Sequence, residues 1–83
     1  MRVSVHLAEP YWRDAGQRDL DMEIEDGGCL ADLFAHLQAR YPALGKTLGE
    51  TAPGAFVNDA QADPQTRLED GSRVHLVWPI AGG

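Results

Sequence analysis

The chain has 83 residues, and its 13 acidic residues against 7 Lys and Arg give a formal net charge of −6. A length of this order supports one hydrophobic core, so we expect a single domain over residues 1–83. The negative charge repels phosphate groups, which argues against nucleic acid and anionic membranes as partners. A domain this small has little room for a deep pocket, so we do not expect a self-sufficient enzyme.

Cysteine content and hydropathy bear on where the protein works. Cys29 is the single cysteine, so the chain cannot form an intramolecular disulfide. The first residues alternate in polarity, unlike the apolar run of a secretion signal, and no stretch approaches the roughly 18 apolar residues of a membrane span. We therefore expect a cytoplasmic protein.

Alternating polarity marks two segments near the amino end. Apolar and polar residues alternate over residues 2–7, which predicts a half-buried strand. The same period of two returns over residues 18–25, where apolar residues alternate with acids, and predicts a second strand. Residues 8–18 contain Pro10 and Gly16, so we interpret them as a connection between the strands.

A helical pattern follows a pair of glycines. The apolar residues Leu30, Leu33, Phe34, Leu37 and Tyr41 are spaced to share one face of a helix. Pro42 ends this helix, and Cys29 stands at its N-cap, where a serine or threonine caps better. With both Phe34 and Leu37 expected in the core, alanine at either position should cost about 2 to 5 kcal/mol of folding free energy.

The rest of the chain alternates between turns and short apolar segments. Residues 43–54 are rich in glycine and proline and predict an irregular crossing that places two leucines on the core. Short strands are predicted over residues 55–58 and 73–78, with turns at residues 58–59 and 69–72. These elements predict an α+β fold, in which one main helix packs across one face of a mixed sheet.

The histidines and the acidic residues 19–26 are explained by exposed positions rather than by a metal site. His6, His36 and His75 fall on outward faces, although His6 and His75 would approach each other if the first and last strands pair. Two imidazoles do not complete a zinc site, so we predict no metal site. The acids between Asp19 and Asp26 resemble a calcium loop in composition, but their alternation favours a solvated or partner-facing strand edge.

The carboxyl end is the remaining candidate. Pro79 cannot donate a hydrogen bond to a sheet, so we expect residues 79–83 to leave the sheet as a flexible tail. Gly82 and Gly83 lack a Cβ atom, so the backbone there can enter a narrow channel and adopt torsions closed to other residues. The tail could thus deliver its carboxylate into another protein's active site.

The closing stretch from Leu68 to Gly83 contains a leucine, an acidic glycine turn, an apolar strand, a proline and a terminal Gly-Gly. A short apolar strand over residues 56–58 ends in asparagine, and the predicted helix with its closing proline covers residues 30–42. In these features the whole chain resembles the ubiquitin-like sulfur carriers MoaD and ThiS, and most closely the small subunit of molybdopterin synthase. Ser72 departs from the pattern, because the family commonly has an acid there; Trp78 replaces a common proline and Cys29 a common threonine.

The resemblance implies a ubiquitin-like β-grasp fold and a specific role for the tail. A ubiquitin-activating-type adenylyltransferase would use ATP to adenylate Gly83, and a sulfur donor would then convert it to a thiocarboxylate. A synthase large subunit, or another acceptor, would take this sulfur, with molybdopterin as the expected product. The carrier itself would bind no cofactor. Its tail comprises Pro79, Ile80, Ala81, Gly82 and Gly83.

The residues just before the tail are the expected docking residues. Val77, Trp78 and Ile80 are large and apolar close to the point where the chain leaves the sheet, where an exposed apolar patch marks an interface. Three other functions remain open: a sulfur carrier for thiamine, cysteine or a secondary metabolite; a protein modifier joined through Gly83 to lysines; and a non-covalent binding module. Products and conjugates would distinguish them.

Overall fold

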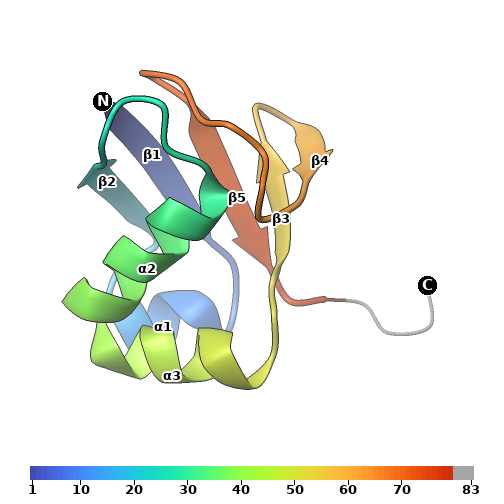
Figure 1. The fold of residues 1–83 in the computed structure, drawn as a ribbon. Coiled ribbons are helices and arrows are strands. Elements are labelled where there is room, and N and C mark those ends of the chain that lie inside the picture. The colour runs from blue at the N-terminus through green and yellow to red at the C-terminus, as the bar shows by residue number, and fades with distance from the viewer. Residues whose placement is uncertain (80–83) are drawn as a thin grey trace.

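The computed structural model describes residues 1–79, which form a five-stranded sheet with helices on one face (Figure 1). The strands are β1 (Arg2–Leu7), β2 (Asp19–Glu23), β3 (Gly54–Val57), β4 (Ala60–Ala62) and β5 (Arg73–Val77). The helices are α1 (Tyr11–Ala15), α2 (Leu30–Arg40) and α3 (Pro42–Glu50).

The order of the strands is β2-β1-β5-β3-β4. The first and last strands, β1 and β5, pair in parallel inside the sheet, while the other neighbouring strands are antiparallel. The mixed sheet and the α2 helix packed across it confirm the predicted α+β, β-grasp architecture. Asn58 and Asp59 form the β3–β4 turn with positive φ angles of 49° and 71°, which short polar side chains tolerate.

The core lies between the sheet and α2. Val3, Val5 and Leu7 project from β1 toward the helix and are buried, as their alternation predicted. Leu33 and Leu37 of α2 are fully buried against them. Phe34 was expected in the core, but its side chain is only partly buried, because it lies at the margin of the apolar face of α2. None of the helices in the described residues is long and apolar enough to cross a membrane.

The connection over residues 8–18 contains a helix that the sequence pattern did not predict. One turn of helix, α1, presents Tyr11 to the core, where this side chain is fully buried. Five residues are too few to display a helical period, so the glycine and proline dominated the sequence interpretation. The short helix α1 packs against α3, and the Thr47 hydroxyl donates a 2.6 Å hydrogen bond to the Asp14 carboxylate.

The predicted irregular crossing over residues 43–54 is largely the helix α3. Pro42 ends α2 and also begins α3, a position where its fixed φ and missing N–H are tolerated. Leu44 and Leu48 are buried, as expected, but they lie on one helical face. Gly45 is the point of closest approach to α2, because a Cβ there would lie 2.9 Å from Gln38 Cα. The two leucines four residues apart were the helical signal.

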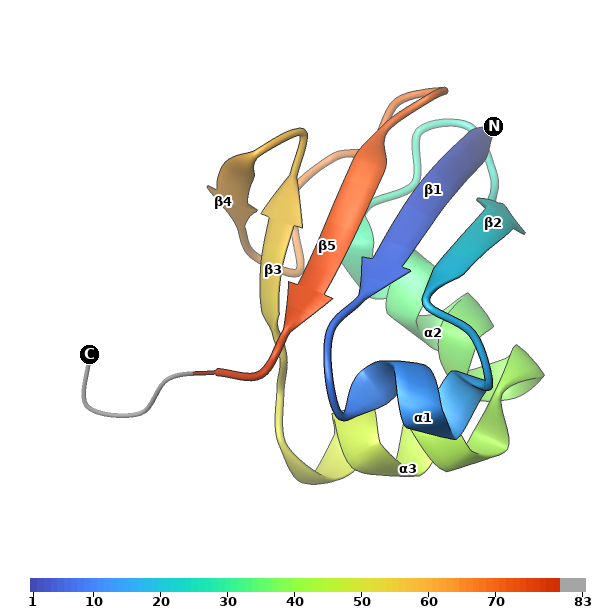
Figure 2. The same cartoon turned by 180° about the vertical axis from the view of Figure 1, so that it is seen from behind.

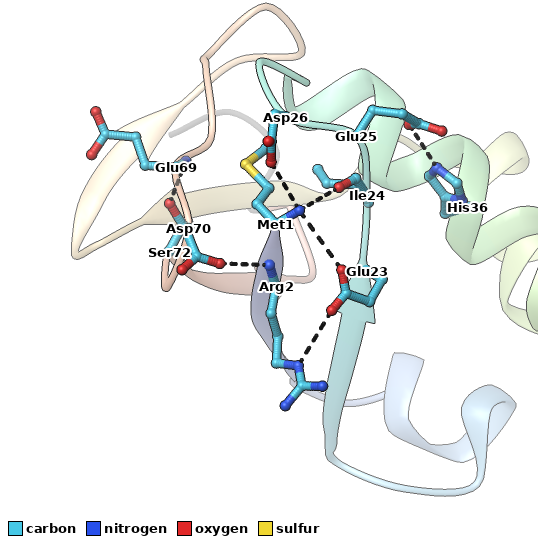
Figure 3. Close-up of polar contacts among 10 residues, drawn as sticks. All are labelled: Met1, Arg2, Glu23, Ile24, Glu25, Asp26, His36, Glu69, Asp70 and Ser72. Atoms are coloured by element: carbon cyan, nitrogen blue, oxygen red, sulfur yellow. Dashed lines mark hydrogen bonds and ion pairs between the residues drawn. The ribbon is translucent and has the colours of Figure 1, made fainter.

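A tight turn before β5 fastens the beginning of the chain. Gly71 has a φ of +85°, and its N–H donates to the Arg2 carbonyl. In return, the Arg2 N–H donates to the Asp70 carboxylate at 2.8 Å (Figure 3). The buried Ser72 hydroxyl accepts a 2.8 Å hydrogen bond from the Glu69 N–H. Ser72 therefore provides the hydrogen-bond acceptor for the Glu69 N–H in this turn, at the position where the family commonly has an acid.

Candidate docking face and carboxyl end

The face of the sheet opposite the helices is open (Figure 2). The strand registers place one row of side chains across this face. From β2 to β4 the row is Asp19, His6, His75, Phe56 and Gln61. All five residues are exposed, so the row runs from an acidic edge, through two imidazoles, to the apolar Phe56 and the amide of Gln61. We call this surface the open face.

The first and last strands do pair, and the two histidines of the row therefore approach each other. The ring centroids of His6 and His75 are 5.2 Å apart, and the ring planes are tilted by 42°. Nδ1 of His6 lies 2.8 Å from the Asp19 carboxylate, which fixes the orientation of this ring. Because both imidazoles remain exposed, they add polar groups to the open face.

A shallow groove of about 490 Å³ lies where β5 ends. It is lined by Gly54, Ala55, Phe56, Gln61, Val77, Trp78 and Pro79. Phe56 is 37% exposed and Trp78 is 48% exposed, and they are the exposed large hydrophobic residues in the described part of the chain. We call this groove the exit groove. It combines exposed apolar surface with Pro79, the last residue that the structure describes.

Trp78 is attached to the core on one side only. Its ring centroid lies 5.9 Å from that of Tyr11, and the planes are tilted by 36°. Burial raises the pKa of the Tyr11 phenol, which keeps the group neutral. The rest of the indole is exposed beside the exit groove. An aromatic side chain that is anchored on one side and exposed on the other is well suited to a protein interface.

The structure brings some of the predicted site residues together. Val77, which is partly buried, lines the exit groove together with Trp78 and Pro79. The other predicted tail residues lie outside the described residues: Ile80, Ala81, Gly82 and Gly83. Phe56 belongs to the exit groove but was not among the predicted docking residues. Its position on a predicted strand, beside two inward-facing neighbours, was the signal that could have identified it.

The other chemically active side chains have structural roles. Asp32 accepts a 2.8 Å hydrogen bond from the Cys29 N–H, which caps α2. Hydrogen bonds from the backbone and side chain of Cys29 lower the pKa of Asp32. His36 lies 3.3 Å from the Glu25 carboxylate. Within residues 1–79, no three histidine, cysteine or acidic side chains form a cluster that could hold a metal ion.

Comparison with known sequences decides the family. The description of the ThiS family matches residues 10–83, which is nearly the whole chain. The chain belongs to the ThiS family. This confirms the resemblance to the ubiquitin-like carriers MoaD and ThiS. No curated protein matches the sequence significantly.

Solved structures extend the comparison from sequence to fold. SAMP1 from Haloferax volcanii superposes with a TM-score of 0.86 at 18% identity, and the match covers 100% of both chains. A complex of subunits 1 and 2 of molybdopterin-converting factor from Helicobacter pylori gives 0.70 at 27% identity, again covering 100% of both chains. The BexX/CysO complex from Amycolatopsis orientalis gives 0.71 at 15% identity, covering 98% of this chain and 99% of that chain.

Proposed function

We propose that this ThiS-family protein is a sulfur carrier whose Gly83 carboxylate becomes a thiocarboxylate, and that it serves molybdopterin synthesis. One observation carries the proposal. The exit groove is lined by the half-exposed Trp78 and by Pro79, and only two residues separate Pro79 from Gly82-Gly83 in the sequence. A docking surface next to a chain end without side-chain bulk is what delivery of that end into a partner requires.

The chemistry follows from the weak reactivity of a carboxylate. The α-carboxyl group has a pKa of about 3.3 to 3.7, so at neutral pH it is ionised and resists nucleophilic attack. Transfer of AMP from ATP would convert it to an acyl adenylate and release pyrophosphate. The terminal sulfur of a persulfide would displace AMP, and a thiol would cleave the resulting acyl disulfide to leave the thiocarboxylate. An activating enzyme must supply this catalysis, so we infer that the carrier is not itself an enzyme.

The open face supports recognition by such partners. Phe56 lies on this face next to His75, and Phe56, Val77 and Trp78 together line the apolar exit groove at the end of β5. Exposed apolar surface of this kind favours association with another protein. We propose that an adenylating enzyme and a synthase large subunit use this face in turn. The subunit complex from Helicobacter pylori supports a partner of the second kind.

Intact-mass measurement tests the proposal. The full chain is incubated with ATP, a sulfur donor and an activating enzyme, and we expect a mass gain equal to the difference between sulfur and oxygen. A variant lacking Gly83 is the matched control and should gain nothing. An unchanged mass of the full chain, with an enzyme that charges another ThiS-family carrier in parallel, would contradict the proposal.

The thiocarboxylate form of the protein also allows a test of which pathway receives its sulfur. Charged protein mixed with a molybdopterin synthase large subunit and its pterin precursor should lose the added sulfur to the pterin. If the thiocarboxylate forms but its sulfur is not transferred to the pterin, the protein would still be a sulfur carrier, but the assignment to molybdopterin synthesis would be wrong. Peptides bearing Gly82-Gly83 on lysine in a cell digest would instead identify a protein modifier.

A further inference from the structure

The β2 edge of the sheet offers a second surface, distant in the strand order from the exit groove. β2 is the terminal strand in the order β2-β1-β5-β3-β4, and it pairs only with β1 in the described structure. Figure 2 shows no other element alongside its outer edge. A strand in this position can accept a further strand through its backbone groups.

The pairing pattern identifies which backbone groups are free. Met1 and Ile24 exchange hydrogen bonds in both directions, and the Leu7 N–H donates to the Arg18 carbonyl. In an antiparallel pair, hydrogen-bonded positions alternate along the strand, so Leu20 and Met22 also point their backbone groups toward β1. The N–H and C=O groups of Asp21 and Glu23 therefore point outward. Within residues 1–79 these groups make no hydrogen bond to another element.

A groove runs beside this free edge. Its volume is about 410 Å³, and it lies between β2 and α2. Its lining residues are Asp21, Met22, Glu23, His36, Ala39 and Arg40. A strand added to β2 would direct every second side chain into this groove, against Met22 and Ala39, and the alternate side chains toward the open face. Met22 and Ala39 form the apolar part of the groove, and Arg40 and His36 lie on its α2 side, so uncharged apolar side chains suit the groove side better than basic ones.

Charge determines which strand the edge can accept. Asp21 and Glu23 are exposed on the open-face side of β2. Glu23 is partly neutralised by Arg2 and the Met1 amino group, each 3.7 Å away (Figure 3), whereas Asp21 has no ion pair within residues 1–79. A second copy of this chain would place acids opposite acids and be repelled, while lysine or arginine would be attracted.

We propose that the β2 edge is a second docking site, which adds an extended segment of a partner protein with alternating basic and apolar residues to the sheet. The basic side chains of that segment lie beside Asp21 and Glu23, and its apolar side chains enter the groove. The carrier can thereby be held by one partner at the β2 edge while the exit groove remains accessible to another. This site does not depend on the chemistry of Gly83.

A synthetic peptide of alternating lysine and valine is a suitable probe. It is titrated at low salt into the full-length protein labelled with ¹⁵N, and a peptide of alternating glutamate and valine is the control. We expect the Asp21 and Glu23 amide resonances to shift and their hydrogen exchange to slow with the lysine peptide only. Absence of shifts, equal response to both peptides, or shifts centred on Phe56 and Trp78 would overturn the proposal.

Two substitutions at one position separate strand addition from general charge attraction. Asp21→Pro removes the outward N–H as well as the charge, whereas Asp21→Asn removes the charge alone. Proline is tolerated on an edge strand when its nitrogen faces solvent. We expect Asp21→Pro to bind the lysine peptide about fivefold more weakly than Asp21→Asn, because an inter-strand hydrogen bond is lost. Equal affinities would overturn the proposal; if Asp21→Pro does not fold, the exchange measurement on the unmodified protein decides.

Discussion

The two faces of the same strand, β5, differ in what surrounds each side chain. Val74 and Leu76 point toward the helices and are completely buried, whereas His75 between them is exposed and Val77 is only partly covered. Buried apolar surface stabilises the fold, but Phe56 on the open face and Trp78 just after β5 remain exposed and gain less from folding. The inner face therefore maintains the fold, whereas the open face and exit groove contribute less to it and are the surfaces that we propose for contact with other proteins.

Replacing a residue of the inner face should have the largest effect on folding. We expect Leu76→Ala to lower the free energy of unfolding by about 2 to 5 kcal/mol, because it leaves a cavity in the core. The adjacent substitution His75→Ala, on the open face, should change it by at most about 0.5 kcal/mol. Urea unfolding followed by circular dichroism measures both. Similar losses for the two variants would eliminate the proposed division between the faces.

Replacing the exposed indole should mainly affect binding. We expect Trp78→Ala to weaken binding to an adenylating enzyme by about 2 kcal/mol, as for a central aromatic residue of an interface. Its effect on unfolding should be smaller, because 48% of the residue is already exposed. Calorimetric titration and a thermal melt give the two quantities. Lys46→Ala, an exposed change on α3, is the matched control; equal losses in binding and stability for Trp78→Ala would contradict the assignment.

Two glycines of α3 extend the comparison to the helical layer. A Cβ on Gly45 would lie 2.9 Å from Gln38 Cα, so we expect Gly45→Ala to force α2 and α3 apart and destabilise the protein by about 1 to 3 kcal/mol. A Cβ on Gly49 has no neighbour within 4 Å. Gly49→Ala should therefore stabilise the helix by up to about 1 kcal/mol. Denaturant unfolding measures both changes. A lower unfolding free energy for Gly45→Ala and a higher one for Gly49→Ala would support the close packing of α2 and α3, whereas a lower value for both variants would contradict it.

The smallest effect concerns the cap of α2. The pKa of Asp32 is lowered in the folded protein, so its contribution is complete above the unfolded-state pKa of about 3.9 and is lost as the pH falls through the folded value. Asp32→Asn should slightly lower stability at neutral pH and reduce the loss between neutral and acidic pH. Thermal melts across this range, with Glu50→Gln as control, measure the difference. An unchanged pH dependence would exclude Asp32 as a contributor.

The sequence predicted β1, β2, β3 and β5, because period-two alternation or a short apolar run is sufficient to mark a strand, but it did not predict β4, whose three residues are too few to show either pattern. Val3, Val5 and Leu7 were all assigned to the correct face. The sequence pattern did not predict α1, which packs on the core through a single buried residue, Tyr11. Whether such a residue is buried depends on tertiary packing, and five residues contain too little periodicity to reveal it.

The candidate site was predicted only in part for a related reason. Val77 and Trp78 stood out because they precede the terminal glycines, and the structure places both in the exit groove. Phe56 lies more than 20 residues earlier in the sequence, and only the antiparallel pairing of β3 with β5 brings it to the same groove. Such long-range pairing is not encoded in local spacing.

The location of the added sulfur tests the central claim most directly. The protein is isolated from cells that express it, and its intact chain is fragmented in a mass spectrometer. We predict that oxygen is replaced by sulfur in the last residue, Gly83. Sulfur added to Cys29 as a persulfide, with an unmodified carboxyl end under conditions that charge another carrier, would contradict the account.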